Sequence, residues 1–170
     1  MKRLLSVSLI LALVISILAG CTLANKLEDV VNDKELTFGD LKVTVPGLYV
    51  DLTETVGNDA LAFVYGIGDT AVLGLKETRS EVTSAIPEID TAKEYAELFL
   101  EANGTDGEVT EKDGIVTFTY NASASGQEFT YLCGAYANDE NFWVVQAYCY
   151  SKNFKENEAD FWNILKSVKV

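Results

Sequence analysis

The sequence of 170 residues contains no histidine. This absence excludes Ser-His and Cys-His nucleophile systems and any metal site that depends on imidazole. The sequence also lacks a D-x-[DN]-x-[DN]-G run, so no calcium loop is expected. Carboxylates remain as catalytic candidates, and the close acidic pairs are Glu28-Asp29, Asp106-Glu108 and Asp139-Glu140. Each pair falls in an expected turn or tether, where solvent-exposed acids without a catalytic role are the usual case.

Basic residues are scarce as well. The chain has 13 Lys and Arg against 26 Asp and Glu, which gives a formal net charge of −13. Such a surface repels nucleic acid, so nucleic acid is excluded as a partner. The charge favours a cationic partner, or it serves only for solubility and for distance from a membrane surface.

The amino-terminal residues 1–20 have the three-part pattern of a secretory signal. Met1-Lys2-Arg3 is positively charged, residues 4–18 are apolar apart from three serines, and Ala19-Gly20 is a pair of small residues. The apolar run is shorter than the ~20 residues that a spanning helix needs. The tetrapeptide Leu18-Ala19-Gly20-Cys21 resembles the bacterial lipobox, which implies cleavage before Cys21 and a diacylglyceryl group on its sulfur. The alternative is an ordinary signal peptide with a chance cysteine.

A lipid anchor on Cys21 would place the protein on the extracytoplasmic face of a bacterial membrane. Two acyl chains on one residue supply the two-chain attachment that stable membrane binding requires. The predicted organisation is a signal peptide over 1–20, a tether over 21–34 and one globular domain over 35–170. Removal of the signal leaves 11 basic and 26 acidic residues, a formal charge of −15.

Two hairpins are predicted in the first half of the domain. Apolar residues alternate at period two over 36–45 on either side of Gly39-Asp40, and strand-like runs follow over 60–65 and 70–78. The segment 66–71 fits the G-x-G-x-x-A dinucleotide fingerprint, which requires a helix to open at the second glycine. The alternating, β-branched residues that follow indicate a strand instead, so no nucleotide cofactor is expected, and nothing else in the sequence indicates one.

The second half predicts an antiparallel meander with two helices. Thr91-Ala92-Lys93-Glu94 forms a capping box, apolar residues follow at helical spacing, and Asn103-Gly104 ends the helix. Four strand-like runs lie between 108 and 150, and the last, 142–150, is apolar on both alternating sets. Both faces of the sheet must therefore be covered. A second apolar stripe ends at Val168, so one helix on each face is the expected arrangement.

The two remaining cysteines are predicted to be free. If residues 138–141 form a hairpin turn, Cys133 lies opposite Gln146 and Cys149 lies opposite Thr130. The two thiols then point to opposite faces of the sheet and cannot form a disulfide or share a metal ion.

The order of elements resembles the PsbP-like α/β/α sandwiches. The resemblance covers residues 35–170 and depends on the phrases VTVPG and F-W-x-I-L-x-S-V and on the segment TAKEYAELFLEANG. That family includes the extrinsic photosystem II protein, a nuclear-transport Ran-binding factor and bacterial lipoproteins of unassigned role. The resemblance implies an α+β fold with an antiparallel sheet between helices, and a non-catalytic accessory or binding role. A histidine-based metal role does not carry over, because this chain has no histidine.

Two functional classes remain open. The first is a membrane-tethered module that binds an unknown protein or small ligand, for which the acidic surface suggests a cationic partner. Its candidate aromatic contacts are Tyr120, Tyr131, Tyr148 and Tyr150, with core packing as the alternative use of each. The second is a carboxylate-dependent hydrolase at the cell envelope, which requires two acids that converge in a pocket.

Overall fold

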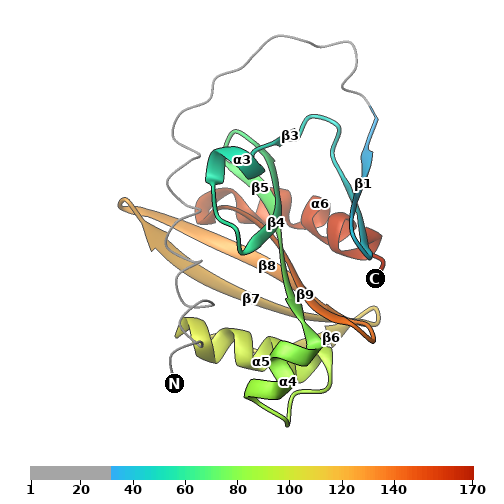
Figure 1. Cartoon of the computed structure of the whole chain (residues 1–170). Helices are drawn as coiled ribbons and strands as arrows, with labels where there is room; N and C mark the ends of the chain where they lie inside the picture. Colours follow the sequence, from blue (N-terminus) through green and yellow to red (C-terminus); the bar gives the residue numbers. More distant parts are fainter. Residues whose placement is uncertain (1–31) are drawn as a thin grey trace.

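The computed structural model describes residues 32–170 (Figure 1). The predicted signal peptide, Cys21 and most of the predicted tether lie outside the described residues. The described chain opens with a separate two-stranded hairpin of β1 (Lys34–Phe38) and β2 (Leu41–Val45). Gly39 occupies its turn with a φ of 65°, a conformation that glycine adopts without strain. The first predicted hairpin is confirmed.

Seven further strands form one antiparallel sheet in the order β3-β4-β5-β9-β8-β7-β6. The predicted second hairpin and the predicted meander are both present, and the pairing of β5 with β9 joins them into a single sheet. The strands are β3 (Val50–Asp51), β4 (Leu61–Ile67), β5 (Thr70–Thr78), β6 (Thr110–Lys112), β7 (Ile115–Ala124), β8 (Gln127–Ala137) and β9 (Asn141–Tyr150).

One face of the sheet is covered by α5 (Ala92–Asn103) together with the short α4 (Arg79–Ala85) (Figure 1). The predicted capping box is present, since Thr91 Oγ1 accepts from the Glu94 amide and the Glu94 carboxylate accepts from the Thr91 amide. Gly104 ends α5 in the left-handed conformation. Tyr95 stacks on Phe142 of β9 with ring centroids 4.7 Å apart. We call this side of the sheet the α5 face.

The opposite face is covered by α6 (Phe154–Ser167) and by the β1–β2 hairpin, and we call it the α6 face (Figure 1). A 3₁₀ turn, Ser151–Asn153, precedes α6. Phe161 and Leu165 are fully buried among the β9 residues that face this side. The expectation that both faces are covered is confirmed, although the hairpin shares the second face with its helix.

Asp40, in the hairpin turn, ties the hairpin to one end of the sheet. Its carboxylate accepts hydrogen bonds from Lys76 (3.0 Å), Asn138 Nδ2 (2.6 Å) and Asn141 Nδ2 (2.7 Å). Partial burial alone would raise the pKa of this carboxyl, but the three donors outweigh burial and hold the pKa well below its usual range. The Asp40 carboxylate therefore connects the β1–β2 turn to β5, to the β8–β9 turn and to the start of β9.

The sequence pattern did not predict two short helices, α3 (Thr53–Val56) and α4. The strand predicted over 70–78 ends where expected, and α4 begins at the next residue. Thr78 caps α4 by accepting a hydrogen bond from the Glu81 amide, and this T-x-x-E spacing is a signal that could have located the helix. β4 also runs two residues further than predicted, to Ile67, so only Gly68 and Asp69 remain in the turn.

Candidate functional site

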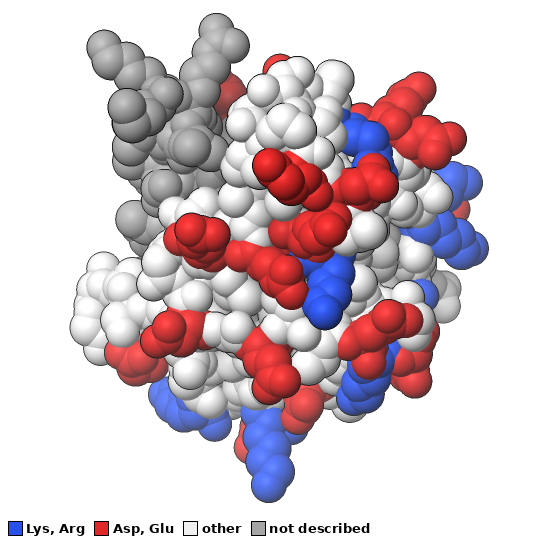
Figure 2. All heavy atoms as spheres, turned by 90° about the horizontal axis from the view of Figure 1, so that it is seen from below, with Lys and Arg blue, Asp and Glu red and all other residues white. Residues whose placement is uncertain are grey.

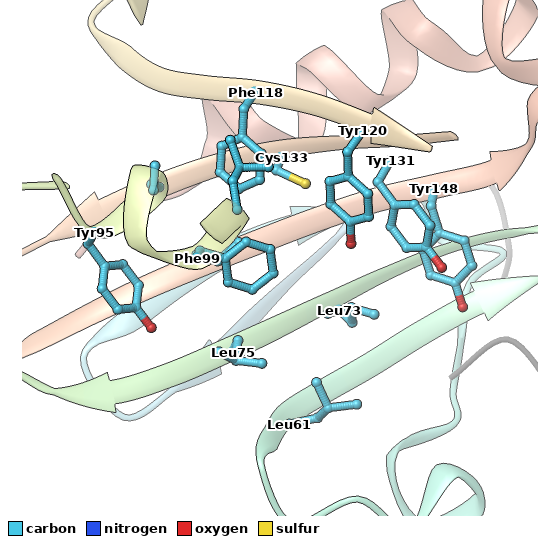
Figure 3. Close-up of a cluster of buried hydrophobic side chains, with 14 of the residues drawn as sticks. Leu61, Leu73, Leu75, Tyr95, Phe99, Phe118, Tyr120, Tyr131, Cys133 and Tyr148 are labelled. Atoms are coloured by element: carbon cyan, nitrogen blue, oxygen red, sulfur yellow. The ribbon is translucent and has the colours of Figure 1, made fainter. Parts of the chain in front are cut away.

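Three of the four tyrosines singled out from the sequence form one row across the α5 face. The strand register pairs Tyr120 with Tyr131 and Tyr131 with Tyr148, so the three side chains lie side by side on β7, β8 and β9 (Figure 3). Their rings are stacked, with centroids 4.6 Å apart for the first pair and 4.7 Å for the second. We call these three residues the tyrosine row.

Gln146 on β9 adds a polar group to this row. The Tyr120 hydroxyl donates a hydrogen bond of 2.5 Å to Gln146 Oε1. Gln146 pairs with Cys133 on β8 and with Leu73 on β5, so its immediate neighbours across the sheet are a thiol and an aliphatic side chain. A glutamine in the otherwise apolar run FWVVQAYCY is a signal for a buried polar site that the sequence interpretation did not use. We call the tyrosine row and Gln146 together the polar cluster.

The hydroxyl groups of Tyr131 and Tyr148 have no hydrogen-bond partner among residues 32–170. The two side chains are nonetheless only 2% and 1% exposed. Neither oxygen is fully enclosed: within the described chain, the one side-chain polar atom that is both completely enclosed and unpartnered is Trp143 Nε1. Each hydroxyl oxygen therefore retains a small accessible area. The amide nitrogen of Gln146 is in the same state.

Burial keeps these groups uncharged. It raises the pKa of each of the three phenols above its usual range, and the neighbouring phenols and the Cys133 thiol raise it further for Tyr120 and Tyr131. Burial also raises the pKa of Cys133. A phenol and a thiol with raised pKa values keep their protons at neutral pH, so the polar cluster can donate and accept hydrogen bonds but provides no base or anionic nucleophile.

Tyr150, the fourth candidate, lies apart from the polar cluster. It is half-buried at the end of β9, where its ring contacts Phe129 with centroids 4.9 Å apart. Lys152 Nζ lies 5.7 Å from the centre of the same ring. All four tyrosines contact other aromatic rings, and their use as ligand contacts remains a prediction.

The predicted register around the cysteines is confirmed. Cys133 lies opposite Gln146, and Cys149 lies opposite Thr130. Both cysteines are buried, and they belong to hydrophobic clusters on opposite faces of the sheet. Within residues 32–170, no group of three or more Cys, Asp or Glu side chains is arranged to hold a metal ion. None of the helices in this part of the chain is long and apolar enough to cross a bilayer.

The outer surface of the α4–α5 layer is strongly acidic. Residues 79–108 contain two basic and eight acidic residues. Figure 2 shows the acidic side chains spread over this surface rather than gathered in one hollow. We call this surface the acidic face, and its acidic residues are Glu81, Glu88, Asp90, Glu94, Glu97, Glu101, Asp106 and Glu108.

The arrangement of a twisted antiparallel sheet between α5 and α6 defines the PsbP-like α/β/α class of folds. Comparison with solved structures agrees. The chain is similar to the cyanobacterial PsbP protein CyanoP from Synechocystis, with a TM-score of 0.57, 13% sequence identity, and coverage of 89% of this chain and 98% of CyanoP. It also resembles a Bacteroides thetaiotaomicron protein, with a TM-score of 0.52, 6% identity and coverage of 81% of this chain and 47% of that one.

A weaker likeness is to the Ran-binding protein Mog1p of Saccharomyces cerevisiae, with a TM-score of 0.49, 12% identity and coverage of 82% of this chain and 96% of Mog1p. No protein-family model and no curated protein matches the sequence. This chain has a PsbP-like fold, as the sequence resemblance predicted. At these identities the likeness establishes the fold and leaves the function to the site.

Proposed function

We propose that this chain is a lipid-anchored protein on the extracytoplasmic face of a bacterial membrane, where it acts as a non-catalytic binding module. The anchor rests on Leu18-Ala19-Gly20-Cys21. The binding role is supported by one observation: Tyr120, Tyr131, Tyr148 and Gln146 converge in the polar cluster, where the hydroxyls of Tyr131 and Tyr148 have no hydrogen-bond partner within residues 32–170. General acid–base catalysis needs a group whose pKa lies near the working pH. The phenols and the thiol are shifted away from that range, which suits recognition rather than proton transfer.

The rival function, a carboxylate-dependent hydrolase, needs two acids directed into one pocket. Seven of the eight acids of the acidic face are exposed, and Glu94 is engaged as a helix cap. Asp40 already accepts hydrogen bonds from three side chains. Solvent-exposed acids spread over an outer surface therefore support a binding role rather than a hydrolase.

The acidic face is the surface we propose for a cationic protein partner. Glu97 is well exposed there, with 55% of its side chain accessible. A photo-crosslinking residue in place of Glu97 should capture a discrete product on intact cells, whereas the same residue in place of Thr119, exposed on β7, should not. Equal products from both positions, or none from either, would contradict a docking role for the acidic face.

The anchor is tested by Cys21→Ala. The native chain should fractionate with membranes and incorporate labelled palmitate, and its intact mass should correspond to a diacylglyceryl chain that begins at Cys21. Cys21→Ala should lose the label and leave the membrane fraction, because two acyl chains contribute most of the membrane affinity. Thr22→Ala is the matched control and should behave as the native chain. A membrane-bound Cys21→Ala protein, or an unmodified native terminus, would overturn the anchor.

A further inference from the structure

We propose that the polar cluster is a binding site for an uncharged, mainly apolar molecule that carries a carbonyl or a similar acceptor oxygen. The proposal deepens the binding role proposed above and is independent of the lipid anchor. It rests on the two phenol hydroxyls, the amide of Gln146 and the apolar side chains around them.

The hydroxyls of Tyr131 and Tyr148 are the primary observation. Buried tyrosine hydroxyls usually find a hydrogen-bond partner, because an unpaired polar group loses its water without compensation. These two have none within residues 32–170, although less than 3% of either side chain is exposed. Both retain a small accessible area at the oxygen. A molecule that reaches this area can satisfy both hydroxyls at once.

The geometry of the row favours one acceptor between two donors. The rings of Tyr131 and Tyr148 stack within 21° of parallel, and their centroids are 4.7 Å apart. Figure 3 shows the three hydroxyl oxygens of the tyrosine row directed to the same side. Two O–H···O bonds of about 2.8 Å together span more than the 4.7 Å between the ring centroids, so hydroxyls at a similar separation can both donate to one carbonyl oxygen placed between them.

The surroundings exclude a charged ligand. Gln146, Cys133 and Leu73 form the next cross-strand row, and Phe118 continues it on β7. Within residues 32–170 no Lys, Arg, Asp or Glu is buried, and the charged group that meets a buried tyrosine of this face, Glu77, accepts from Tyr95 rather than from the tyrosine row. A buried charge without a counter-charge is strongly unfavourable. An uncharged ligand with an apolar body avoids this penalty.

The test uses the mature chain, Cys21 to Val170, expressed in the bacterial cytoplasm so that Cys21 receives no diacylglyceryl group. The probe is 6-propionyl-2-dimethylaminonaphthalene, an uncharged ketone whose emission reports hydrogen bonding to its carbonyl. It should bind saturably with one site per chain. The anionic probe 8-anilinonaphthalene-1-sulfonate, of similar size, should bind at least about tenfold more weakly, because no cation lies in the site.

Removal of the two hydroxyls is the decisive change. Tyr131→Phe with Tyr148→Phe keeps the ring stack but should weaken ketone binding about tenfold and shift its emission to the blue, since two hydrogen bonds are lost. The matched control is Tyr136→Phe, whose hydroxyl donates to Leu165 O on the α6 face. It should bind the ketone as the native chain does.

Three results would overturn the site. They are no saturable ketone binding by a cooperatively folded chain, equal binding by the native chain and the double variant, and tighter binding of the anionic probe. A crystal structure with an ordered water on both hydroxyls, together with absent ketone binding, would assign the cluster to water alone. The fractionation of Cys21→Ala has a separate variant and readout, so failure of the ligand site and failure of the anchor are distinguishable.

Discussion

The two faces of the sheet are buried to a similar degree, yet they treat polar groups differently. On the α6 face, the Tyr136 hydroxyl donates to the Leu165 carbonyl at 2.7 Å, and Trp143 Nε1 is the one enclosed donor without a partner in the described chain. On the α5 face, the hydroxyls of Tyr131 and Tyr148 have no hydrogen-bond partner within residues 32–170, but a small area of each oxygen is accessible. The α5 face therefore contains two buried phenol hydroxyls that no described residue satisfies.

One strand supplies both environments. Along β9, Trp143, Val145, Ala147 and Cys149 join the cluster under α6, while Phe142, Val144 and Tyr148 join the cluster under α5. The outer surfaces of the layers also differ. The α4–α5 segment has two basic and eight acidic residues, whereas the hairpin (34–45) and the carboxyl-terminal segment (151–170) together have six basic and five acidic residues. We therefore expect a partner to contact the α5 side, as proposed above, rather than the α6 side.

The largest expected effect is on the α6 side. Phe161 is fully buried, and Phe161→Ala should lower the free energy of unfolding by about 3–5 kcal/mol, because it leaves a cavity under α6. Urea denaturation followed by circular dichroism measures the change. Lys155→Ala, exposed on the same helix, is the control and should change stability by less than about 0.5 kcal/mol. A loss below about 1 kcal/mol for Phe161→Ala would show that this face is not tightly packed.

Close packing on the α6 side can also be tested by adding one methyl group. A Cβ at Gly74 would overlap the ring of Phe63, which is fully buried and stacks on Phe38 with centroids 4.3 Å apart. Gly74→Ala should therefore cost about 1–3 kcal/mol through overpacking. Gly68→Ala is the control for backbone strain, because no atom lies near the position of its Cβ. The left-handed φ of 62° at Gly68 should lower the free energy of unfolding of this variant by about 1 kcal/mol. Equal or greater stability of Gly74→Ala would show that the ring moves freely.

The contact that holds the hairpin on the α6 side should depend on pH. Asp40 is 25% exposed at its side chain, and Asp40→Asn should cost about 1–3 kcal/mol at pH 7 through loss of the charged hydrogen bonds. A carboxyl with a lowered folded-state pKa contributes stability above its unfolded pKa of about 3.9 and loses it as the pH falls toward the folded value. The difference between native and Asp40→Asn should therefore shrink on acidification. A difference in unfolding free energy that is constant between about pH 7 and pH 2 would contradict this linkage.

The smallest effects distinguish the polar groups of the two faces directly. Tyr136→Phe should lose about 0.5–1.5 kcal/mol, because the Leu165 carbonyl loses its donor. Tyr131→Phe and Tyr148→Phe should each change stability by less than about 0.5 kcal/mol, since no bond to a described residue is broken. Thermal and urea unfolding of the three variants measure the contrast. A large loss for Tyr131→Phe would mean that its hydroxyl has a structural role.

Local patterns were sufficient for elements that carry their own signals. The capping box at Thr91 and Glu94 located α5, and the turn residues at 138–141 fixed the register that places Cys133 opposite Gln146. Short elements were missed because four to seven residues hold too little periodicity to identify a helix. α4 was also missed, although Thr78 and Glu81 have the spacing of a helix cap at its start and could have located it.

The polar cluster could be predicted only in part. Tyr120, Tyr131 and Tyr148 were selected as aromatic residues of the meander, but their alignment in one row depends on three strands pairing in register. The contribution of Gln146 depends on the same pairing. Tyr150 has the same sequence character but lies outside the cluster, because it pairs with Phe129 at the end of β9, on the side of Tyr148 away from Gln146.

The sequence by itself determined the antiparallel α+β class, the helix that begins after Thr91, and the need for cover on both sides of β9, because capping and apolar periodicity act between near neighbours in the chain. The tertiary structure decided that β5 pairs with β9, that the first hairpin lies against α6, and that two phenol hydroxyls have no partner among the described residues. Those features arise from contacts between residues tens of positions apart, and such contacts leave no local pattern in the chain.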